Sequence, residues 1–352
     1  MKVVHLIFSF QTGGAEAMLV DIMNEQSKAE NVTLIVINNL INESLIQKIN
    51  PLVSIVRINR RQSSKNPIPL IKLNWILYKL NPELIHCHDI KGIGLLLPPF
   101  RKRTVLTIHE MNIQNSDFVK YRKCFAISEA VKKDILARYD LKAELIYNGI
   151  FISEIICREQ KENKPEIFRI VQVGRLEHQK KGQHLLIEAL NSLVNEHKVT
   201  NIHLDIIGNG SSLQFLKDIV NQYNLNGFIN FLGEKDREFI YQNLCKYNLL
   251  VQPSLFEGFG LTVAEAMAAK VPVLVSDANG PVELIKDGVY GYHFKSGDME
   301  DLTRQIMKIR TNYMETKELT EKAYKYTCEN FDISITVENY LKQYRQITAK
   351  MI

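Results

Sequence analysis

The sequence predicts an α/β protein built from two doubly wound parallel-sheet domains. Its 352 residues are enough for two ordinary domains, each able to bury a core of its own. Short runs of β-branched and aliphatic residues recur, each bounded by turn residues and followed by helical periodicity. This alternation is interrupted once, by a charged stretch over residues 153–165. We therefore expect two doubly wound sheets with a cleft between them.

The strand-like runs place the elements in order. The first domain is predicted over residues 1–150, and its runs are Val3 to Phe8, Val32 to Ile37, Val53 to Ile58, Leu84 to His88 and Val105 to Ile108. A linker follows over residues 151–166. The second domain is predicted over residues 167–330, and its runs are Ile167 to Val173, Ile202 to Ile207, Ile229 to Leu232, Leu249 to Gln252 and Val271 to Val275. Residues 331–352 are expected to form a helix that returns to the first domain.

Composition excludes several classes of protein. Apolar residues make up 45% and charged residues 24% of the chain, which is typical of a globular rather than a disordered or fibrous protein. No run of 18 apolar residues predicts a membrane span, and the N-terminus lacks a secretory pattern. The five cysteines are widely spaced without a Cys-x-x-Cys pair, so we expect neither disulfides nor a zinc finger. A cytoplasmic location is predicted.

The positive charge is concentrated in the first half. The net charge is +5, with 23 − 16 = +7 up to Lys164 and 21 − 23 = −2 after it. This favours an anionic surface or ligand, although ordinary solvated faces give the same pattern; no base-reading motif points to nucleic acid. The weakly amphipathic stretch Ile68 to Leu80, with Lys72 and Trp75, suits either a core helix or peripheral docking on an anionic membrane.

The first glycine-rich turn follows the first strand. Gly13 and Gly14 precede a predicted helix that carries Glu16 in its first turn, and backbone N–H groups at such a helix start can bind an anion. A tight turn without a ligand is the alternative. The chain lacks both the Gly-x-Gly-x-x-Gly pattern with its ribose carboxylate and the P-loop motif. NAD and ATP sites of those kinds are therefore not expected.

Two further turns lie in the second domain. Arg175 and Lys181 follow its first strand, and a planar guanidinium with a nearby ammonium suits a diphosphate. Lys180 is the alternative to Lys181. The third turn is a glycine-rich segment that precedes another predicted helix, and it consists of Gly208, Asn209 and Gly210. Its glycines would let a nucleotide approach the backbone closely.

The most informative segment runs from Pro253 to Ala268. A glycine loop leads from Glu257 into an Ala-rich helix that holds Glu265, so both carboxylates can face one pocket while N–H groups of the helix start point at an anion. Carboxylates accept hydrogen bonds from paired hydroxyls, which suits a sugar at one end and a ribose at the other. The loop and helix-start residues expected to bind substrate are Gly258, Phe259, Gly260, Leu261 and Thr262.

This segment, with seven residues between Glu257 and Glu265, resembles the donor-site motif of the retaining glycosyltransferase family 4. The resemblance extends along most of the chain. Further motifs that carry it are Gly-Gly-Ala-Glu at 13–16, His-Cys-His-Asp at 86–89, Thr-Ile-His-Glu at 107–110, Ile-Ser-Glu-Ala-Val at 127–131, Tyr-Asn-Gly at 147–149, Val-Gly-Arg-Leu at 173–176, Phe-Leu-Gly at 231–233 and Gly-Pro-Val-Glu-Leu-Ile at 280–285.

The resemblance implies a GT-B fold, in which two Rossmann-like domains face each other across a cleft and a nucleotide-sugar is held mainly by the second domain. Arg175 and Lys181 would bind the diphosphate, Glu265 the ribose and Glu257 the sugar hydroxyls. From the first domain, the Gly13–Gly14 turn would contact the phosphate, and His109 would lie beside the transferred sugar. The residues with expected catalytic roles are thus His109, Arg175, Lys181 and Glu257.

The resemblance also implies the chemistry. Transfer would retain the anomeric configuration through an oxocarbenium-like, front-side route, with no metal, no cofactor and no carboxylate nucleophile. His86 and His88 share one face of a strand as two metal ligands could, but structural or cleft-lining roles fit the metal-free expectation better.

The expected reaction is that of a hexosyltransferase-like enzyme. It would move a hexose or N-acetylhexosamine from a UDP- or GDP-sugar to a glycan or polyprenyl-diphosphate-linked acceptor, in bacterial lipopolysaccharide, capsule or related polysaccharide synthesis, at the inner face of the plasma membrane. The alternatives are a GT-B UDP-sugar epimerase and a non-catalytic protein that binds nucleotide-sugars or glycans.

Overall fold

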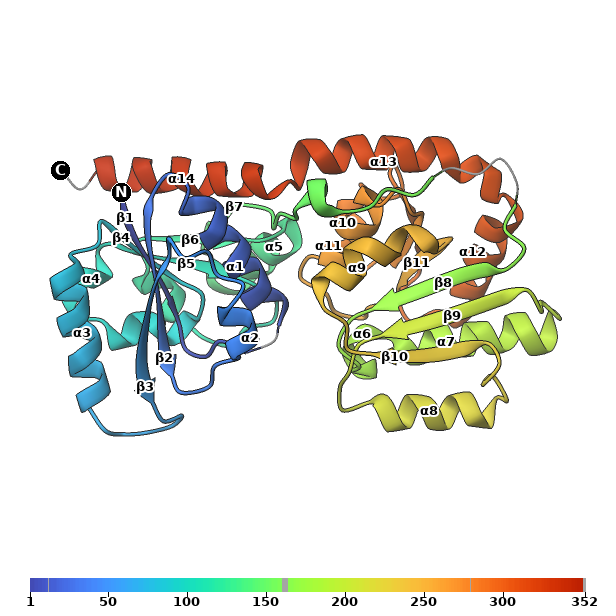
Figure 1. Cartoon of the computed structure of the whole chain (residues 1–352), viewed down its shortest axis with the longest axis horizontal. Helices are drawn as coiled ribbons and strands as arrows, with labels where there is room; N and C mark the ends of the chain where they lie inside the picture. The colour runs from blue at the N-terminus through green and yellow to red at the C-terminus, as the bar shows by residue number, and fades with distance from the viewer. Residues whose placement is uncertain (12, 160–163, 279, 351–352) are drawn as a thin grey trace. The chain divides into compact units, whose positions relative to one another are not determined.

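The structure is a computed structural model that describes residues 1–11, 13–159, 164–278 and 280–350. The chain divides into two compact units (Figure 1). Unit 1 consists of Met1–Ile150 and Ile333–Ile352, and unit 2 consists of Phe151–Asp332. Over the residues that the structure describes, each unit contains one sheet.

Unit 1 is a Rossmann-like layered unit. In its described part, parallel strands form a seven-stranded sheet in the order β3-β2-β1-β4-β5-β6-β7, which begins with the dinucleotide-fold order 3-2-1-4-5-6. The strands are β1 (Lys2–Ile7), β2 (Asn31–Asn38), β3 (Ser54–Arg60), β4 (Leu84–Cys87), β5 (Thr104–Ile108), β6 (Lys123–Ala126) and β7 (Glu144–Leu145). The helices are α1 (Gly14–Gln26), α2 (Glu43–Ile46), α3 (Ile68–Leu80), α4 (Pro98–Arg101), α5 (Glu129–Tyr139) and α14 (Ile333–Ala349).

The central strands of unit 1 are buried on both faces, which explains their continuous apolar sequences. In β2, every residue after Asn31 is buried, and Leu34 and Val36 pack in one cluster with Leu19 of α1. The five strand-like runs of the first domain are confirmed. Two strands, β6 and β7, were not expected, because the sequence of β6 (Lys-Cys-Phe-Ala) holds no β-branched residue and β7 has only two residues.

The helix α14 belongs to unit 1. The Ile333 N–H donates to the Ile150 carbonyl at 3.0 Å, and the Thr336 hydroxyl donates to the Tyr147 carbonyl at 2.9 Å. A Cβ on Gly149 would lie 2.6 Å from the Ile333 Cα, so only glycine allows this approach. The expected return of the C-terminal helix to the first domain corresponds to this packing.

Unit 2 has the same type of layered architecture as unit 1. In its described part, six parallel strands lie in the order β10-β9-β8-β11-β12-β13, again the 3-2-1-4-5-6 arrangement. The strands are β8 (Phe168–Val173), β9 (Ile202–Ile207), β10 (Ile229–Gly233), β11 (Leu249–Gln252), β12 (Val273–Ser276) and β13 (Tyr292–Phe294). The helices are α6 (His178–Lys181), α7 (Gln183–Asn191), α8 (Leu213–Gln222), α9 (Arg237–Asn243), α10 (Leu261–Ala268), α11 (Gly280–Leu284), α12 (Met299–Thr311) and α13 (Thr316–Asn330).

The predicted linker over residues 151–166 packs on unit 2 where it is described. The Ile156 N–H donates to the Tyr241 carbonyl at 3.1 Å, and the Arg158 N–H donates to the Ala269 carbonyl at 2.9 Å. Residues 160–163 lie outside the described residues. In the described part of the chain, no helix combines the length and the apolar character that a membrane span requires.

Candidate functional site

The predicted turns of unit 2 lie together at the carboxyl ends of its strands. The Gly174 N–H donates to the Ile207 carbonyl and the Leu176 N–H to the Asn209 carbonyl, both at 2.9 Å. Gly208 has a φ of +143°, and a Cβ there would collide with the Gly174 carbonyl. The Gly174–Arg175 turn and the Gly208–Gly210 turn therefore form one continuous rim.

The loop after β11 is joined to the same rim. The N–H groups of Leu255 and Phe256 both donate to the Lys180 carbonyl, at 2.8 and 3.1 Å. Gly182 adopts a φ of +65°, and a Cβ there would collide with the Pro253 carbonyl. These backbone contacts bring α6 against the loop that carries Glu257.

Lys181 forms an ion pair with Glu257, although the two residues are far apart in sequence. Their side chains are 22% and 18% exposed, so both remain accessible to a ligand. Gln252, which is buried, donates from Nε2 to Glu257 Oε2 at 3.4 Å and to the Ser254 hydroxyl at 2.8 Å. Lys180 is exposed instead and lies 3.5 Å from Glu177. Of the two lysines, Lys181 is thus the one held beside Glu257.

The helix α10 starts at this point. Its N-cap is Gly260, with a φ of +101° and no side-chain cap, so the first-turn N–H groups have no capping side chain. Glu265 lies in the same helix and is buried. The side chain of Phe259 is buried against Phe331, with ring centroids 5.7 Å apart, which leaves only its backbone for a ligand.

The remaining predicted residues of unit 2 lie on the same rim. The Thr262 hydroxyl donates to Gln252 Oε1 at 3.5 Å, and the Gly280 N–H donates to the Glu257 carbonyl at 3.1 Å, which packs α11 against Gly258. Arg175 is exposed, and its guanidinium has no partner among the described residues. The rim therefore presents two cations, two carboxylates and an open helix start.

In unit 1, the first glycine turn lies at the start of α1. Gly13 is the N-cap in an extended conformation, and a Cβ there would collide with the Glu16 carboxylate. Gly14 is exposed at the first helical position, where its N–H faces no intrahelical acceptor. The turn thus has the open helix start that the sequence predicts, with Glu16 folded over it.

His109 directly follows β5 and is half-buried. Its Nε2 lies 3.3 Å from His88 Nδ1. Burial lowers the pKa of His109 to about 4, so the ring is neutral near pH 7. His88 itself is buried and bonded to His5, a residue that sequence reasoning did not single out. The strand register, which pairs His5 with His86, was the missing information.

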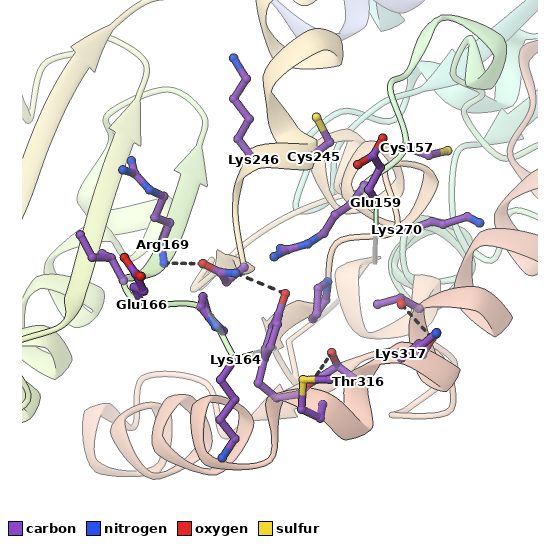
Figure 2. Close-up of a pocket in the computed structure, with 18 of the residues that line it drawn as sticks. Cys157, Glu159, Lys164, Glu166, Arg169, Cys245, Lys246, Lys270, Thr316 and Lys317 are labelled. Carbon is purple, nitrogen blue, oxygen red and sulfur yellow. Dashed lines mark hydrogen bonds between the residues drawn. The ribbon is translucent and has the colours of Figure 1, made fainter. Parts of the chain in front are cut away.

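A cavity of about 770 Å³ lies elsewhere in unit 2 (Figure 2). It opens at the amino ends of β8 and β11, where the Arg169 N–H donates to Asn248 Oδ1 at 2.8 Å. Basic side chains surround it, among them Lys164, Lys246 and Lys270. None of the predicted site residues lines it, so this cavity is separate from the rim at the carboxyl ends.

Comparison with known proteins agrees with the fold. Residues 12–154 match the family model Glycosyltransferase Family 4, and residues 154–326 match the family model Glycosyl transferases group 1. The chain therefore belongs to the glycosyltransferases that combine these two domains. The crystal structure of Anabaena HepE in complex with UDP and glucose superposes with a TM-score of 0.80 at 20% identity, over 97% of this chain and 99% of that one. The GT-B fold is thereby confirmed.

The relatives found by sequence match a smaller part of this chain than the solved structure does. An uncharacterized glycosyltransferase of Methanocaldococcus jannaschii is 30% identical over 59% of this chain, which spans 61% of that relative's length. The lipopolysaccharide 1,6-galactosyltransferase of Salmonella typhimurium is 25% identical to this chain, over 66% of this chain and 67% of that relative's length.

Proposed function

We propose that this chain is a retaining, metal-independent glycosyltransferase that takes a hexose or N-acetylhexosamine from a UDP- or GDP-sugar. The observation that carries the proposal is the Lys181–Glu257 ion pair beside the open start of α10. It places a cation and a hydroxyl acceptor at the carboxyl edge of a Rossmann-like sheet, where ligands of such sheets bind. The family to which the chain belongs supports the same reaction.

In this proposal the diphosphate is the leaving group, and positive charge stabilises it. Arg175 is free to turn towards the phosphates, and Lys181 can exchange its bond with Glu257 for one with a phosphate oxygen. The first-turn N–H groups of α10 add a further partial positive charge. As the sugar–oxygen bond breaks, these groups stabilise the departing negative charge more than the bound donor, which lowers the barrier.

The two carboxylates bind hydroxyls. Glu257 accepts from the sugar and Glu265 from the ribose, and neither attacks carbon, in contrast to the carboxylate pair of a retaining glycosidase. From unit 1, Gly13 and Gly14 contact the phosphate and His109 hydrogen-bonds the transferred sugar. The turn formed by Gly208, Asn209 and Gly210 contacts the nucleoside.

The acceptor is proposed to be a glycan or a polyprenyl-diphosphate-linked saccharide in surface polysaccharide synthesis, with the enzyme in the cytoplasm at the membrane. The lipopolysaccharide galactosyltransferase among its relatives supports this setting. The discriminating experiment measures nucleoside diphosphate release from UDP-, GDP- and ADP-sugars without metal, with and without lipid-linked acceptor. Acceptor-stimulated release from one donor is expected. An isomerised nucleotide-sugar without release would instead favour the epimerase.

A matched pair of lysine variants tests the site. Loss of one charged hydrogen bond should reduce donor turnover in Lys181→Met by about 10- to 150-fold. Lys180→Met should stay within about twofold of wild type, because that side chain is solvated. Glu257→Gln should reduce transfer much more than UDP affinity. Equal effects of the two lysine substitutions would contradict this site.

Peripheral membrane contact is proposed through α3. Only Leu73 and Leu77 of this helix are buried, so the expectation of an ordinary core helix fails for its other face. One face exposes an apolar stripe whose side chains are 54% to 77% accessible: Ile68, Ile71, Trp75 and Tyr78. Lys79 lies 3.9 Å from the Trp75 ring centroid, so positive charge flanks the stripe.

Vesicle binding tests this contact. Vesicles containing phosphatidylglycerol should retain the protein and shift its Trp75 fluorescence, whereas phosphatidylcholine vesicles should not. Ile71→Ser should weaken binding about tenfold, because an apolar side chain then no longer enters the interface. Leu52→Ser is the control, since Leu52 is equally exposed but lies outside the stripe. Equal loss in both variants would refute the role of α3.

A further inference from the structure

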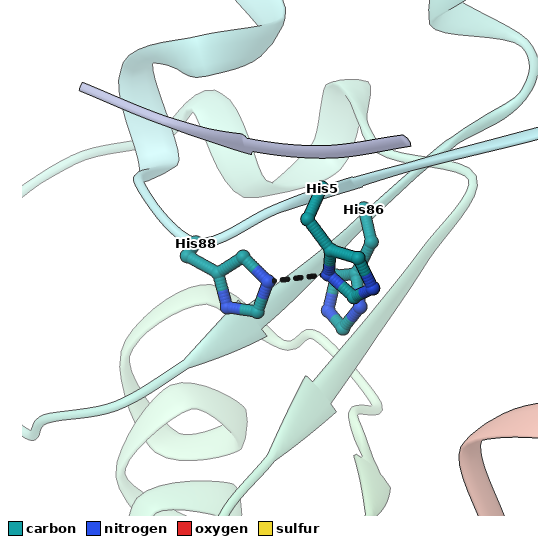
Figure 3. A group of neighbouring side chains, drawn as sticks. All are labelled: His5, His86 and His88. Atoms are coloured by element: carbon teal, nitrogen blue, oxygen red, sulfur yellow. Dashed lines mark hydrogen bonds between the residues drawn. The ribbon is translucent and has the colours of Figure 1, made fainter. Parts of the chain in front are cut away.

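A row of histidines runs through the interior of unit 1 and ends at His109. His5 lies in β1, and His88 follows β4, the neighbouring strand. His5 Nδ1 lies 3.0 Å from His88 Nε2, and His88 Nδ1 lies 3.3 Å from His109 Nε2. Figure 3 shows the first of these contacts. At the inner end, His5 Nε2 lies 2.8 Å from Gln26 Oε1.

The protons of this row can be assigned one by one. The structure turns the amide oxygen of Gln26 towards His5, and an amide oxygen only accepts, so in this orientation His5 donates to Gln26 from Nε2. A neutral imidazole carries one N–H, so His5 Nδ1 is then an acceptor and His88 donates to it from Nε2. By the same rule His88 Nδ1 accepts from His109 Nε2. Three protons satisfy three hydrogen bonds, with all donors pointing towards Gln26.

Burial keeps the row neutral, which the assignment requires. His5 and Gln26 are fully buried, and burial lowers the pKa of His5 to about 4. Burial also lowers the pKa of His88 well below its ordinary value, helped by the neighbouring histidines. None of the three rings therefore gains a second N–H near pH 7, and the direction of the hydrogen bonds is maintained.

We propose that Gln26, His5 and His88 are positioning residues that fix His109 as the Nε2–H tautomer, with a bare Nδ1 lone pair facing the ligand. This rests on the proposed function of His109 and makes it more specific. Among the described residues, no group occupies that Nδ1. Its partner must then be a hydrogen-bond donor, such as a sugar hydroxyl or an amide N–H, and an acceptor-only group would be disfavoured there.

The same rings could in principle hold a metal ion, since His5, His86 and His88 place nitrogen atoms within 4.8 Å of one another. Each nitrogen is already used. His86 Nδ1 lies 2.5 Å from the Tyr344 hydroxyl and His86 Nε2 lies 2.7 Å from the Thr107 hydroxyl. With the contacts of His5 and His88, all six ring nitrogens have partners within the protein. This pattern favours a hydrogen-bonded row over a metal centre.

The direct test is ¹⁵N NMR of the full chain labelled at histidine, because protonated and unprotonated ring nitrogens give separate resonances. His109→Asn assigns the signal. We expect His109 with protonated Nε2 and unprotonated Nδ1 from about pH 6 to 8. A proton on His109 Nδ1 in the wild type would overturn the proposal, as would tight Zn²⁺ binding that shifts the His5 and His88 signals.

Two variants at position 5 separate positioning from packing. His5→Gln offers an amide N–H to Gln26 and an oxygen to His88, so the tautomer of His109 should be unchanged. His5→Leu offers neither, and both tautomers of His109 should appear. An unchanged His109 tautomer in folded His5→Leu would overturn the proposal. If this variant does not fold, the tautomer of His109 in the wild-type spectrum tests the proposal instead.

Activity distinguishes this inference from the function on which it rests. Donor turnover should fall roughly three- to tenfold in His5→Leu and recover in His5→Gln, as expected when one neutral hydrogen bond to the ligand is lost part of the time. If the spectra follow the prediction but turnover stays unchanged, the tautomer assignment holds and the proposed contact of His109 with the sugar is refuted.

Discussion

Mild acid is expected to destabilise unit 1 through its buried histidines. His5, His86 and His88 are buried and His109 is half-buried, and burial lowers the pKa of all four. In the unfolded chain these rings titrate near pH 6.5. Between that pH and about pH 4, where His5 titrates in the folded state, the unfolded state binds more protons. Stability is therefore present above pH 6.5 and is lost as the pH falls.

The size of the effect follows from the number of rings. Each ring that stays neutral in the folded state and becomes charged in the unfolded state costs about 1.4 kcal/mol per pH unit. From pH 6.5 to pH 5 this amounts to about 2 kcal/mol for each of the four rings, or about 8 kcal/mol together. A loss of that size is comparable with the whole stability of many domains, about 5–15 kcal/mol.

The assay can observe unit 1 alone. The chain has one tryptophan, Trp75, and it lies in α3 of unit 1. Urea unfolding followed by its fluorescence at several pH values gives the free energy of this unit. His5→Gln should reduce the pH dependence by about one quarter, because one of four titrating rings is removed. A midpoint that does not move between pH 7 and pH 5 would refute the reasoning.

Three further outcomes are expected. Arg175→Ala and Glu265→Ala should each weaken UDP binding by about 1.5–3 kcal/mol in calorimetry, because each removes a charged hydrogen bond; unchanged affinity in both would contradict the nucleotide site. Gly208→Ala should destabilise unit 2 by about 2 kcal/mol or more, since its φ of +143° and the Gly174 carbonyl leave no room for a Cβ. Gly227→Ala is the control, because a Cβ there meets no atom within 4 Å; equal thermal shifts would contradict the argument.

Most of the fold could be predicted because its strands are buried on both faces. Such strands appear in a sequence as continuous apolar runs, as in β2 and β9, and the single interruption marked the boundary near residue 150. β7 and β13 have only two and three residues, too few for a pattern to emerge. The packing of residues 151–159 on unit 2 depends on backbone hydrogen bonds, which a charged sequence does not reveal.

The site was only partly predictable for a related reason. Glycine spacing and carboxylate pairing in one segment pointed to Glu257 and Glu265. The contact of Lys181 with Glu257 depends on the loop after β11 bonding to the Lys180 carbonyl, a tertiary feature. Gln252 and His5 were missed because the role of a polar residue inside an apolar strand cannot be inferred until its neighbours across the sheet are known.

The packing of α14 has a consequence for biosynthesis. Tyr340 and Tyr344 of this helix fill the core of unit 1 and bond to Thr107 and His86. On the ribosome, the first 150 residues of the chain must therefore wait until all of residues 151–332 have been made. At 5–20 residues per second that delay is roughly 10–40 s, long enough for unit 2 to fold first. Until the last helix emerges, nascent unit 1 exposes an apolar surface that a chaperone would recognise.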